Sequence, residues 1–264
     1  MKNIKNVVLV SSGKGGVGKS TVSVNLSIAL SKKNLNVGLL DADIYGPSIP
    51  KLLGIEGKPS VTKEKKILPF QKFGIKFMSI GNMIPVDKPV VWRAPMVVGA
   101  LNQLLRDIEW GDLDFLVIDL PPGTGDIQLS LSQNLPLAGA IIVSTPQEVA
   151  LIDVRRAINM FRKVNVKILG IIENMSYFQN NKNQEKIFLF GKEGAQNEAS
   201  KQNINFLGDI PILEEISKSS DAGKPVAFID SSPISKKFES ISSKLCKIVK
   251  ANKVEQPSIE IIED

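Results

Sequence analysis

A glycine-rich run with the sequence GKGGVGKST constrains the fold of this chain more than any other feature. It follows the valine-rich run 5–11 and precedes residues 19–32, whose apolar side chains recur at helical spacing. Strand, glycine-rich turn and helix in this order match G-x-x-x-x-G-K-[ST], whose converging backbone N–H groups hold a polyphosphate. We therefore predict a phosphate-binding loop that comprises Gly13, Lys14, Gly15, Gly16, Val17, Gly18, Lys19, Ser20 and Thr21.

Two side chains of this loop have chemistry suited to a nucleoside triphosphate. The helix that starts near Lys19 directs its positive end toward the loop, where it favours an anion. We expect the Lys19 ammonium group to contact the β- and γ-phosphates and the Ser20 hydroxyl to ligate Mg²⁺. The sequence thus predicts ATP and Mg²⁺ as ligands and Mg²⁺-dependent, slow ATP hydrolysis as the activity.

Apolar runs and amphipathic stretches alternate along the rest of the chain. This alternation favours an α/β fold with a doubly wound, mostly parallel sheet flanked by helices. Buried parallel strands read as continuous apolar runs. Strands are predicted at 5–11, 36–40, 113–119, 139–144, 166–172 and 205–210, the last as an edge strand, and helices at 19–32, 148–164 and 232–251.

The chain of 264 residues is predicted to form a single P-loop ATPase domain over residues 1–251. Residues 54–90 are rich in Lys, Gly and Pro, and we interpret them as an inserted hairpin beside the nucleotide site, with β-like pieces at 66–70 and 75–80. The Asn-rich stretch 176–192 is predicted to be irregular, and residues 252–264 to be a flexible tail.

Composition excludes several kinds of chemistry and of partner. The chain has no histidine and one cysteine, Cys246, which excludes Ser-His catalysis, His-ligated zinc and an intramolecular disulfide. Cys246 is predicted to be a small buried residue of the last helix. The net charge of +6 comes from scattered lysines, and no apolar run could span a bilayer. We therefore expect a cytoplasmic protein that binds neither nucleic acid nor membrane.

Carboxylates follow two of the predicted strands, where they would lie beside a nucleotide bound at the carboxyl edge of a parallel sheet. Asp119 ends the apolar run 116–119 and is expected to hold a Mg²⁺-bound water, and residues 120–126 would form a switch loop. After the run 36–40 come Asp41 and Asp43. Asp41 is expected either to support Mg²⁺ hydration or to fix the loop geometry.

An early second lysine, Lys14, makes the phosphate loop resemble the deviant P-loop of the MinD, ParA and nitrogenase-iron-protein group. This resemblance implies a homodimer in which Lys14 reaches the partner's phosphates, as an arginine finger does. It also implies that Asp43 positions the attacking water and that Asn174, after strand 166–172, reads the purine base. The loop 208–211, with Pro211, would form the second wall of the base pocket.

Longer blocks resemble the Mrp/ApbC family of iron–sulfur cluster carrier ATPases. They are DADIYGPSIP (41–50), VWRAPM (91–96), DLPPGTGD (119–126), TPQEVAL (145–151), ENMSYF (173–178) and KSSDAGKP (218–225). The resemblance covers about residues 7–248 and implies a dimeric carrier that serves iron–sulfur assembly or apo-client proteins. Where the family has Cys-x-x-Cys, however, this chain has Asn180 and Asn183, and amides are poor iron ligands. Ala94 replaces a usual glycine with little expected effect.

Three functions remain to be compared. The first is an iron–sulfur carrier ATPase whose nucleotide state gates cargo loading and transfer. The second is a cluster-free regulatory ATPase that acts on a protein client, which the missing thiolates favour. The third, a positioning ATPase on membrane or DNA, lacks the basic amphipathic tail or basic face that it needs.

Overall fold

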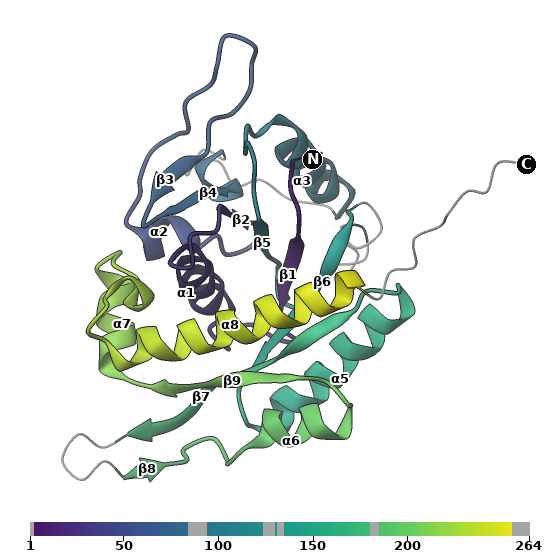
Figure 1. The fold of residues 1–264 in the computed structure, drawn as a ribbon, viewed down its shortest axis with the longest axis vertical. Helices are drawn as coiled ribbons and strands as arrows, with labels where there is room; N and C mark the ends of the chain where they lie inside the picture. Colours follow the sequence, from purple (N-terminus) through teal and green to yellow (C-terminus); the bar gives the residue numbers. More distant parts are fainter. Residues whose placement is uncertain (1–2, 84–93, 124–129, 131–134, 180–184, 255–264) are drawn as a thin grey trace, which may run out of the picture.

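The computed structural model describes residues 3–83, 94–123, 130, 135–179 and 185–254. They form one sheet, mostly parallel, between two layers of helices (Figure 1). The strands are β1 (Val7–Ser11), β2 (Val37–Asp41), β3 (Phe70–Lys72), β4 (Ile75–Ser79), β5 (Phe115–Asp119), β6 (Leu137–Ser144), β7 (Ile168–Gln179), β8 (Lys186–Ile187) and β9 (Phe206–Ile212).

Several of the helices connect parallel strands, as crossover units require. The helices are α1 (Lys19–Ser31), α2 (Ile49–Leu53), α3 (Ala94–Asp107), α5 (Glu148–Lys163), α6 (Gly194–Lys201), α7 (Glu214–Asp221) and α8 (Pro233–Val254), with 3₁₀ turns η1 (Ile80–Asn82) and η2 (Val226–Phe228). The predicted α/β class, a doubly wound and mostly parallel sheet flanked by helices, is confirmed.

The strand order is β3-β4-β2-β5-β1-β6-β7-β8, and β9 pairs with β7. Strands β4, β2, β5, β1, β6, β7 and β9 are mutually parallel, whereas β3 and β8 run antiparallel to β4 and β7. The order extends from β1 toward β2 on one side and toward β7 on the other. The loop after β1 therefore lies where the strand order reverses, the usual ligand position in open α/β sheets.

Two apolar cores lie on opposite faces of the sheet. Alternate residues of β1 face opposite sides, so that Val7 and Leu9 pack with α3, α5 and α6, and Val8 and Val10 pack with α1 and α8. All of these strand side chains are almost fully buried. Burial on both faces explains why the strand reads as a continuous valine-rich run.

The structure corrects three predicted boundaries. β7 does not stop at residue 172 but continues to Gln179, because β9 and β8 pair with its polar second half. Part of the stretch predicted to be irregular is therefore strand. The predicted hairpin exists as β3 and β4, but β4 is also a parallel member of the main sheet beside β2. Finally, α8 extends past residue 251 to Val254.

Candidate nucleotide site

The glycine-rich loop lies at the carboxyl end of β1 and leads directly into α1. Gly16 and Gly18 have φ angles of 80° and 79°, in the left-handed region that glycine adopts without strain. Gly18 is the N-cap of α1, so the free N–H groups of the first turn face the loop. A hollow of about 250 Å³ lies here, lined by Ser12, Lys14, Gly15, Gly16, Val17, Gly18, Lys19, Ser20, Thr21, Asp43, Gly46, Ser48 and Pro122.

Two glycines of the loop are packed too closely for any side chain. A Cβ atom on Gly13 would lie 2.4 Å from Cβ of Asp153 on α5, and one on Gly18 would lie 2.2 Å from Nδ2 of Asn174. Neighbouring elements thus fix the loop at both ends. Lys14 is half-buried and lines the hollow of its own chain, and its contact with the phosphates of a partner stays a prediction.

The Lys19 ammonium group forms the electrostatic centre of the site. Its side chain is 6% exposed, and its Nζ atom lies 2.9 Å from Oδ2 of Asp119 and 3.6 Å from Oδ2 of Asp43. The Ser20 hydroxyl donates a hydrogen bond of 2.6 Å to the same Oδ2 atom of Asp119. The structure therefore brings together four of the predicted site residues.

A second serine of α1, which the sequence analysis missed, also holds Asp119. Ser23 Oγ donates a hydrogen bond of 2.6 Å to Asp119 Oδ1, and both side chains are completely buried. Its hydroxyl also lies 3.1 Å from the carbonyl oxygen of Lys19. Each oxygen of the Asp119 carboxylate thus has its own serine partner, which fixes the plane of the group.

Asp41 is fully buried and organises the turn after β2. Its Oδ1 accepts a hydrogen bond from the backbone N–H of Asp43, and its Oδ2 accepts from the N–H of Ile49 and from Ser79 Oγ at 2.9 Å. Burial, together with repulsion from Asp119, raises the pKa of Asp41 to about 7. These contacts match the loop-fixing role that was predicted for Asp41; its alternative role near Mg²⁺ stays a prediction.

Asp43 is mostly buried and lines the hollow opposite the phosphate loop. Burial raises the pKa of its carboxyl group, while the charge on Lys19 opposes this shift. Its Oδ1 atom has no hydrogen-bond partner. The water-positioning role that the resemblance implies for Asp43 stays a prediction.

Asn174 lies inside β7, not after the end of a strand as predicted. Its side-chain amide donates a hydrogen bond of 2.8 Å to the carbonyl oxygen of Val17. This bond connects the phosphate loop to β7. The base-reading role stays a prediction. Pro211 is buried in β9, and its neighbour Ile210 is in register with Asn174 across the β7–β9 pair.

The oxygen atoms around Ser20 and Asp119 fit a magnesium ion. Mg²⁺ prefers hard oxygen ligands and usually takes one or two from protein, with the remainder from phosphates and water. Among the described residues, no cluster of three or more His, Cys, Asp or Glu side chains could hold a metal ion. A cation at this site would therefore be bound together with the nucleotide, with Ser20 and Asp119 as its protein partners.

Several of the positions that bear on cargo binding lie outside the part of the chain that the structure describes. Asn180, Asn183 and residues 124–126 of the switch loop lie outside the described residues, but Gly123 donates its N–H to the Ser12 carbonyl oxygen. Cys246 is half-buried on α8 and lines a cavity with Asn6 and Phe115, at the amino ends of β1 and β5. It therefore faces the edge of the sheet opposite the phosphate loop.

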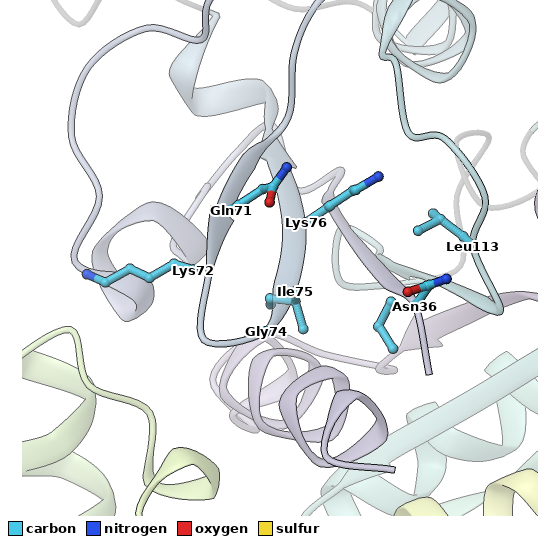
Figure 2. Close-up of a pocket in the computed structure, with 8 residues that line it drawn as sticks. Asn36, Gln71, Lys72, Gly74, Ile75, Lys76 and Leu113 are labelled. Atoms are coloured by element: carbon cyan, nitrogen blue, oxygen red, sulfur yellow. The ribbon is translucent and has the colours of Figure 1, made fainter. Parts of the chain in front are cut away.

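Another hollow, of about 380 Å³, lies at that same amino edge (Figure 2). Figure 2 shows that Lys72 and Lys76 extend to opposite sides of it. Both ammonium groups already donate hydrogen bonds to carbonyl oxygens, Lys72 to Leu53 and Lys76 to Trp110. The hollow that contains the predicted phosphate loop lies at the opposite, carboxyl edge of the sheet.

Fold and phosphate loop together define a P-loop NTPase, and comparison with known proteins specifies which. The family model described as NUBPL iron-transfer P-loop NTPase, of the ParA group, matches residues 3–246. The chain belongs to this family. It is 52% identical over 250 residues to the iron-sulfur cluster transfer protein NUBPL of Dictyostelium discoideum, covering 94% of this chain and 77% of that protein.

A bacterial relative and one solved structure are also similar to this chain, and a second solved structure shares its fold. The iron-sulfur cluster carrier protein of Aquifex aeolicus is 48% identical, covering 94% of this chain and 69% of that protein. A nucleotide-binding protein from Archaeoglobus fulgidus in complex with ADP superposes with a TM-score of 0.76 at 41% identity, covering 88% and 91% of the two chains. MinD of Pyrococcus horikoshii, complexed with Mg-ADP, shares the fold with a TM-score of 0.67 at 21% identity, covering 94% and 98%.

Proposed function

We propose that this chain is a Mg²⁺-dependent ATPase that transfers iron–sulfur clusters to apo-client proteins and works as a homodimer. The observation that carries the ATPase part is that Lys19 Nζ and Ser20 Oγ, at the start of α1, each lie within 2.9 Å of Oδ2 of Asp119, at the end of β5. The names of the relatives support the transfer part.

In this proposal, different residues of the site bind the phosphates, position the attacking water and contact the base. Arriving phosphates would compete with Asp119 for the Lys19 ammonium group, because that ion pair neutralises the lysine in their absence. The bound Mg²⁺ ion would supply neutralisation of charge on the phosphate oxygens. Asp43 would hold the attacking water through its uncommitted Oδ1 atom. Asn174 and Pro211 would contact the base.

In the proposed dimer, each nucleotide would also meet the Lys14 ammonium group of the partner protomer. In the group with a second loop lysine, Lys14 of one protomer acts on the nucleotide of its partner, so hydrolysis requires association. Closure with ATP and opening after hydrolysis would then gate cargo loading and release. We place this activity in the cytoplasm. Among the described residues, no helix has the length and apolar character that crossing a membrane requires.

Cargo binding needs thiolates that this chain does not supply in the usual way. A dimer would offer two cysteines, one Cys246 from each chain, and both are half-buried thiols whose pKa burial raises. A four-thiolate cluster at the dimer interface would therefore need ligands from a client or from a small thiol. A relative in Arabidopsis thaliana is named as an iron-sulfur protein required for NADH dehydrogenase.

The shortage of cysteine ligands in this chain favours a second candidate function. With one cysteine and with Asn180 and Asn183 at the family's Cys positions, the chain would act as a cluster-free regulatory ATPase on a protein client. It would keep the nucleotide switch and use the same dimer closure to hold or release that client.

Nucleotide binding is tested first, with a matched pair of lysine variants. Lys19→Ala should lose most ATP affinity, whereas Lys32→Ala, at the other end of α1 and paired with Asp230, should bind ATP like the wild type. Circular dichroism and thermal unfolding would establish that both variants are folded. Unchanged ATP affinity of folded Lys19→Ala protein would overturn the site assignment.

Cargo is tested by anaerobic reconstitution of the full chain, followed by iron and sulfide determination and the visible absorption spectrum. Stoichiometric cluster that is lost in Cys246→Ser would support a cluster site that uses α8. Stoichiometric cluster that survives this substitution would support ligands from external thiols. Absence of cluster with intact ATPase activity, with or without added glutathione, would favour the regulatory function instead.

A further inference from the structure

The block KSSDAGKP (218–225) has no part in the site described above, yet its glycine lies against a segment that leads from the nucleotide hollow. Gly223 follows the end of α7, and its N–H donates a hydrogen bond to the carbonyl oxygen of Ser220. Gly54 caps the end of α2, and its N–H donates to the carbonyl oxygen of Lys51. The φ angles of Gly54 and Gly223 are 59° and 64°, which glycine adopts without strain. Each helix therefore ends in a left-handed glycine.

The ends of α2 and α7, which are neighbours in Figure 1, touch through their backbones. A Cβ atom on Gly223 would lie 2.5 Å from Cα and 2.7 Å from N of Gly54. Ordinary contact with a Cβ atom begins at 3.4 Å, so any side chain at residue 223 would separate the two segments by about 1 Å. Lys72 also holds the end of α2, because its Nζ atom donates hydrogen bonds of 2.7 Å and 3.1 Å to the carbonyl oxygens of Leu53 and Gly54.

The Gly223 side of this contact is fastened to α1, the helix that begins at the phosphate loop. The N–H of Ala227 donates a hydrogen bond of 2.8 Å to Oδ1 of Asn25, which is 2% exposed. Nδ2 of Asn25 donates in turn to the carbonyl oxygen of Thr21, the last residue of the predicted loop. Ser235 Oγ on α8 donates to the carbonyl oxygen of Ala227 and holds the same turn. A separation forced between the two glycines would therefore be taken up by α2, which has five residues.

The Gly54 side of the contact leads to the turn 43–48, which borders the hollow. Asp43, Gly46 and Ser48 of this turn line the hollow, and α2 begins at the next residue, Ile49. Asp41 holds both ends of the turn, because its carboxylate accepts hydrogen bonds from the N–H groups of Asp43 and Ile49. A shift of α2 would therefore pull on the turn and displace Asp43 relative to the phosphate loop.

We propose that the contact between Gly54 and Gly223 is a positioning contact for ATP hydrolysis, an inference that rests on the proposed ATPase function. It fixes the distance between the turn 43–48, which follows β2, and the phosphate loop, which continues into α1. Neither glycine lines the hollow, so both act through α2. Phosphate binding by residues 13–21 does not need this contact. Hydrolysis does, because a misplacement of about 1 Å in a reacting group can slow a reaction by about 100-fold.

Steady-state hydrolysis and equilibrium binding of ATP by the full chain test this division. Gly223→Ala should lower kcat at least about tenfold and leave the Kd for ATP unchanged, because the turn 43–48 moves and the phosphate loop does not. Gly54→Ala should have a smaller effect of the same kind, since its Cβ would lie 3.2 Å from Gly223, and it replaces Gly223→Ala if that variant does not fold. Thermal unfolding establishes which variants are folded.

Gly57→Ala is the matched control for both variants. Gly57 has φ of 93°, and an added Cβ would meet no atom within 4 Å, so the substitution strains the backbone without a collision. This variant should keep the wild-type kcat and the wild-type Kd for ATP. A fall in its kcat equal to that of Gly223→Ala would show that backbone strain alone is responsible, and would overturn the proposal.

Hydrogen exchange of backbone amides tests the same contact without activity. The N–H of Ile49, which donates to Asp41, should exchange at least about fivefold faster in Gly223→Ala, with unchanged exchange in α1. Wild-type kcat in folded Gly223→Ala, a loss of ATP affinity as large as the loss of kcat, or unchanged exchange at Ile49 would each overturn the proposal. A wild-type chain that binds ATP without hydrolysing it would contradict the proposed function instead, and exchange at Ile49 would still decide whether the glycine contact holds the turn.

Discussion

Ser23 of α1 donates a hydrogen bond of 2.6 Å to Oδ1 of Asp119 at the end of β5. The phosphate-loop pattern contains Ser20 but not Ser23, yet both serines hold the same carboxylate. Because α1 begins at the loop, this bond ties the first turns of the helix to the carboxylate of the neighbouring strand. The orientation of Asp119 is therefore set by the first two turns of α1.

Removal of this hydroxyl should weaken the affinity of the site for its cation. We predict that Ser23→Ala raises the Mg²⁺ concentration for half-maximal ATP hydrolysis by about tenfold, as loss of a partner of a metal-site carboxylate typically does. ATP affinity in EDTA should be unchanged, and Ser23→Thr should restore the Mg²⁺ response. ATP binding measured across an Mg²⁺ titration checks the effect without activity.

Ser27→Ala is the matched control for this prediction. Ser27 is a buried serine on the same helix, and its hydroxyl donates to the carbonyl oxygen of Ser23 without contacting Asp119. It should lose comparable stability and keep the wild-type Mg²⁺ response. If the two variants shift the Mg²⁺ titration equally, the role of Ser23 is only structural.

The action of Lys14 across a dimer interface makes a complementation prediction. Lys14→Ala should bind ATP but hydrolyse it at least about 100-fold more slowly, since a finger residue typically contributes more than this. Lys19→Ala should be inactive because it loses the phosphate contact. A mixed dimer of the two variants should regain activity in one site, which contains Lys19 and receives Lys14 from the partner. Mixtures as inactive as their parents would show that Lys14 acts within its own chain.

The buried Asp41 carboxyl predicts a pH dependence of folding. Its pKa is raised to about 7 in the folded chain from 3.8, so between these values the folded state holds a proton that the unfolded state has released. The contribution of Asp41 to the free energy of unfolding is therefore most favourable at low pH. It falls as pH rises from about 4 to about 7, by up to about 4 kcal/mol.

Urea unfolding of the wild type and of Asp41→Asn at pH 5, 6, 7 and 8 measures this contribution. Asp41→Asn cannot titrate, so the wild type should lose stability relative to the variant as the pH rises toward 7, with little further change above it. A constant difference between the two proteins across this range would show that Asp41 is ionised in the folded state.

Substitution of Gly18 should impair nucleotide binding, because a side chain there would strain the backbone and overlap a neighbouring residue. Its φ angle is 79°, and an added Cβ would meet Asn174 Nδ2 at 2.2 Å. We expect Gly18→Ala to displace the amide that supports Val17 and to lower ATP affinity at least tenfold. Gly57→Ala is the control, because Gly57 has φ of 93° and an added Cβ would meet no atom within 4 Å. It should cost about 1–2 kcal/mol of stability and leave ATP affinity unchanged; equal losses of affinity would contradict the argument.

Much of this architecture could be predicted because the signals are local. The run 5–11, the glycine-rich loop and the helix that begins at Lys19 are contiguous, and their pattern specifies both the fold class and the place of the phosphate loop. Asp119 was identified for a similar reason, since it ends an apolar run. Each of these inferences needs only the neighbours of a residue in the sequence.

The contacts that were missed join distant segments. Ser23 and Ser79 hold Asp119 and Asp41 across sequence separations of 96 and 38 residues, and a lone serine within a helix or strand gives no pattern that predicts such a partner. The polar second half of β7 lacks the apolar run of a buried strand. It is a strand because β8 and β9 supply its hydrogen bonds.

The length of β7 has a consequence for how such proteins diversify. The strand that places Asn174 beside the phosphate loop runs on to Gln179, and residues 180–184, with Asn180 and Asn183, follow at once in the chain. β9 pairs with β7 on both sides of the irregularity at 174–178. The end of β7 therefore separates Asn174 from residue 180 by roughly 15 Å. Substitutions beyond the end of β7 would leave unchanged the strand that holds Asn174 against the phosphate loop.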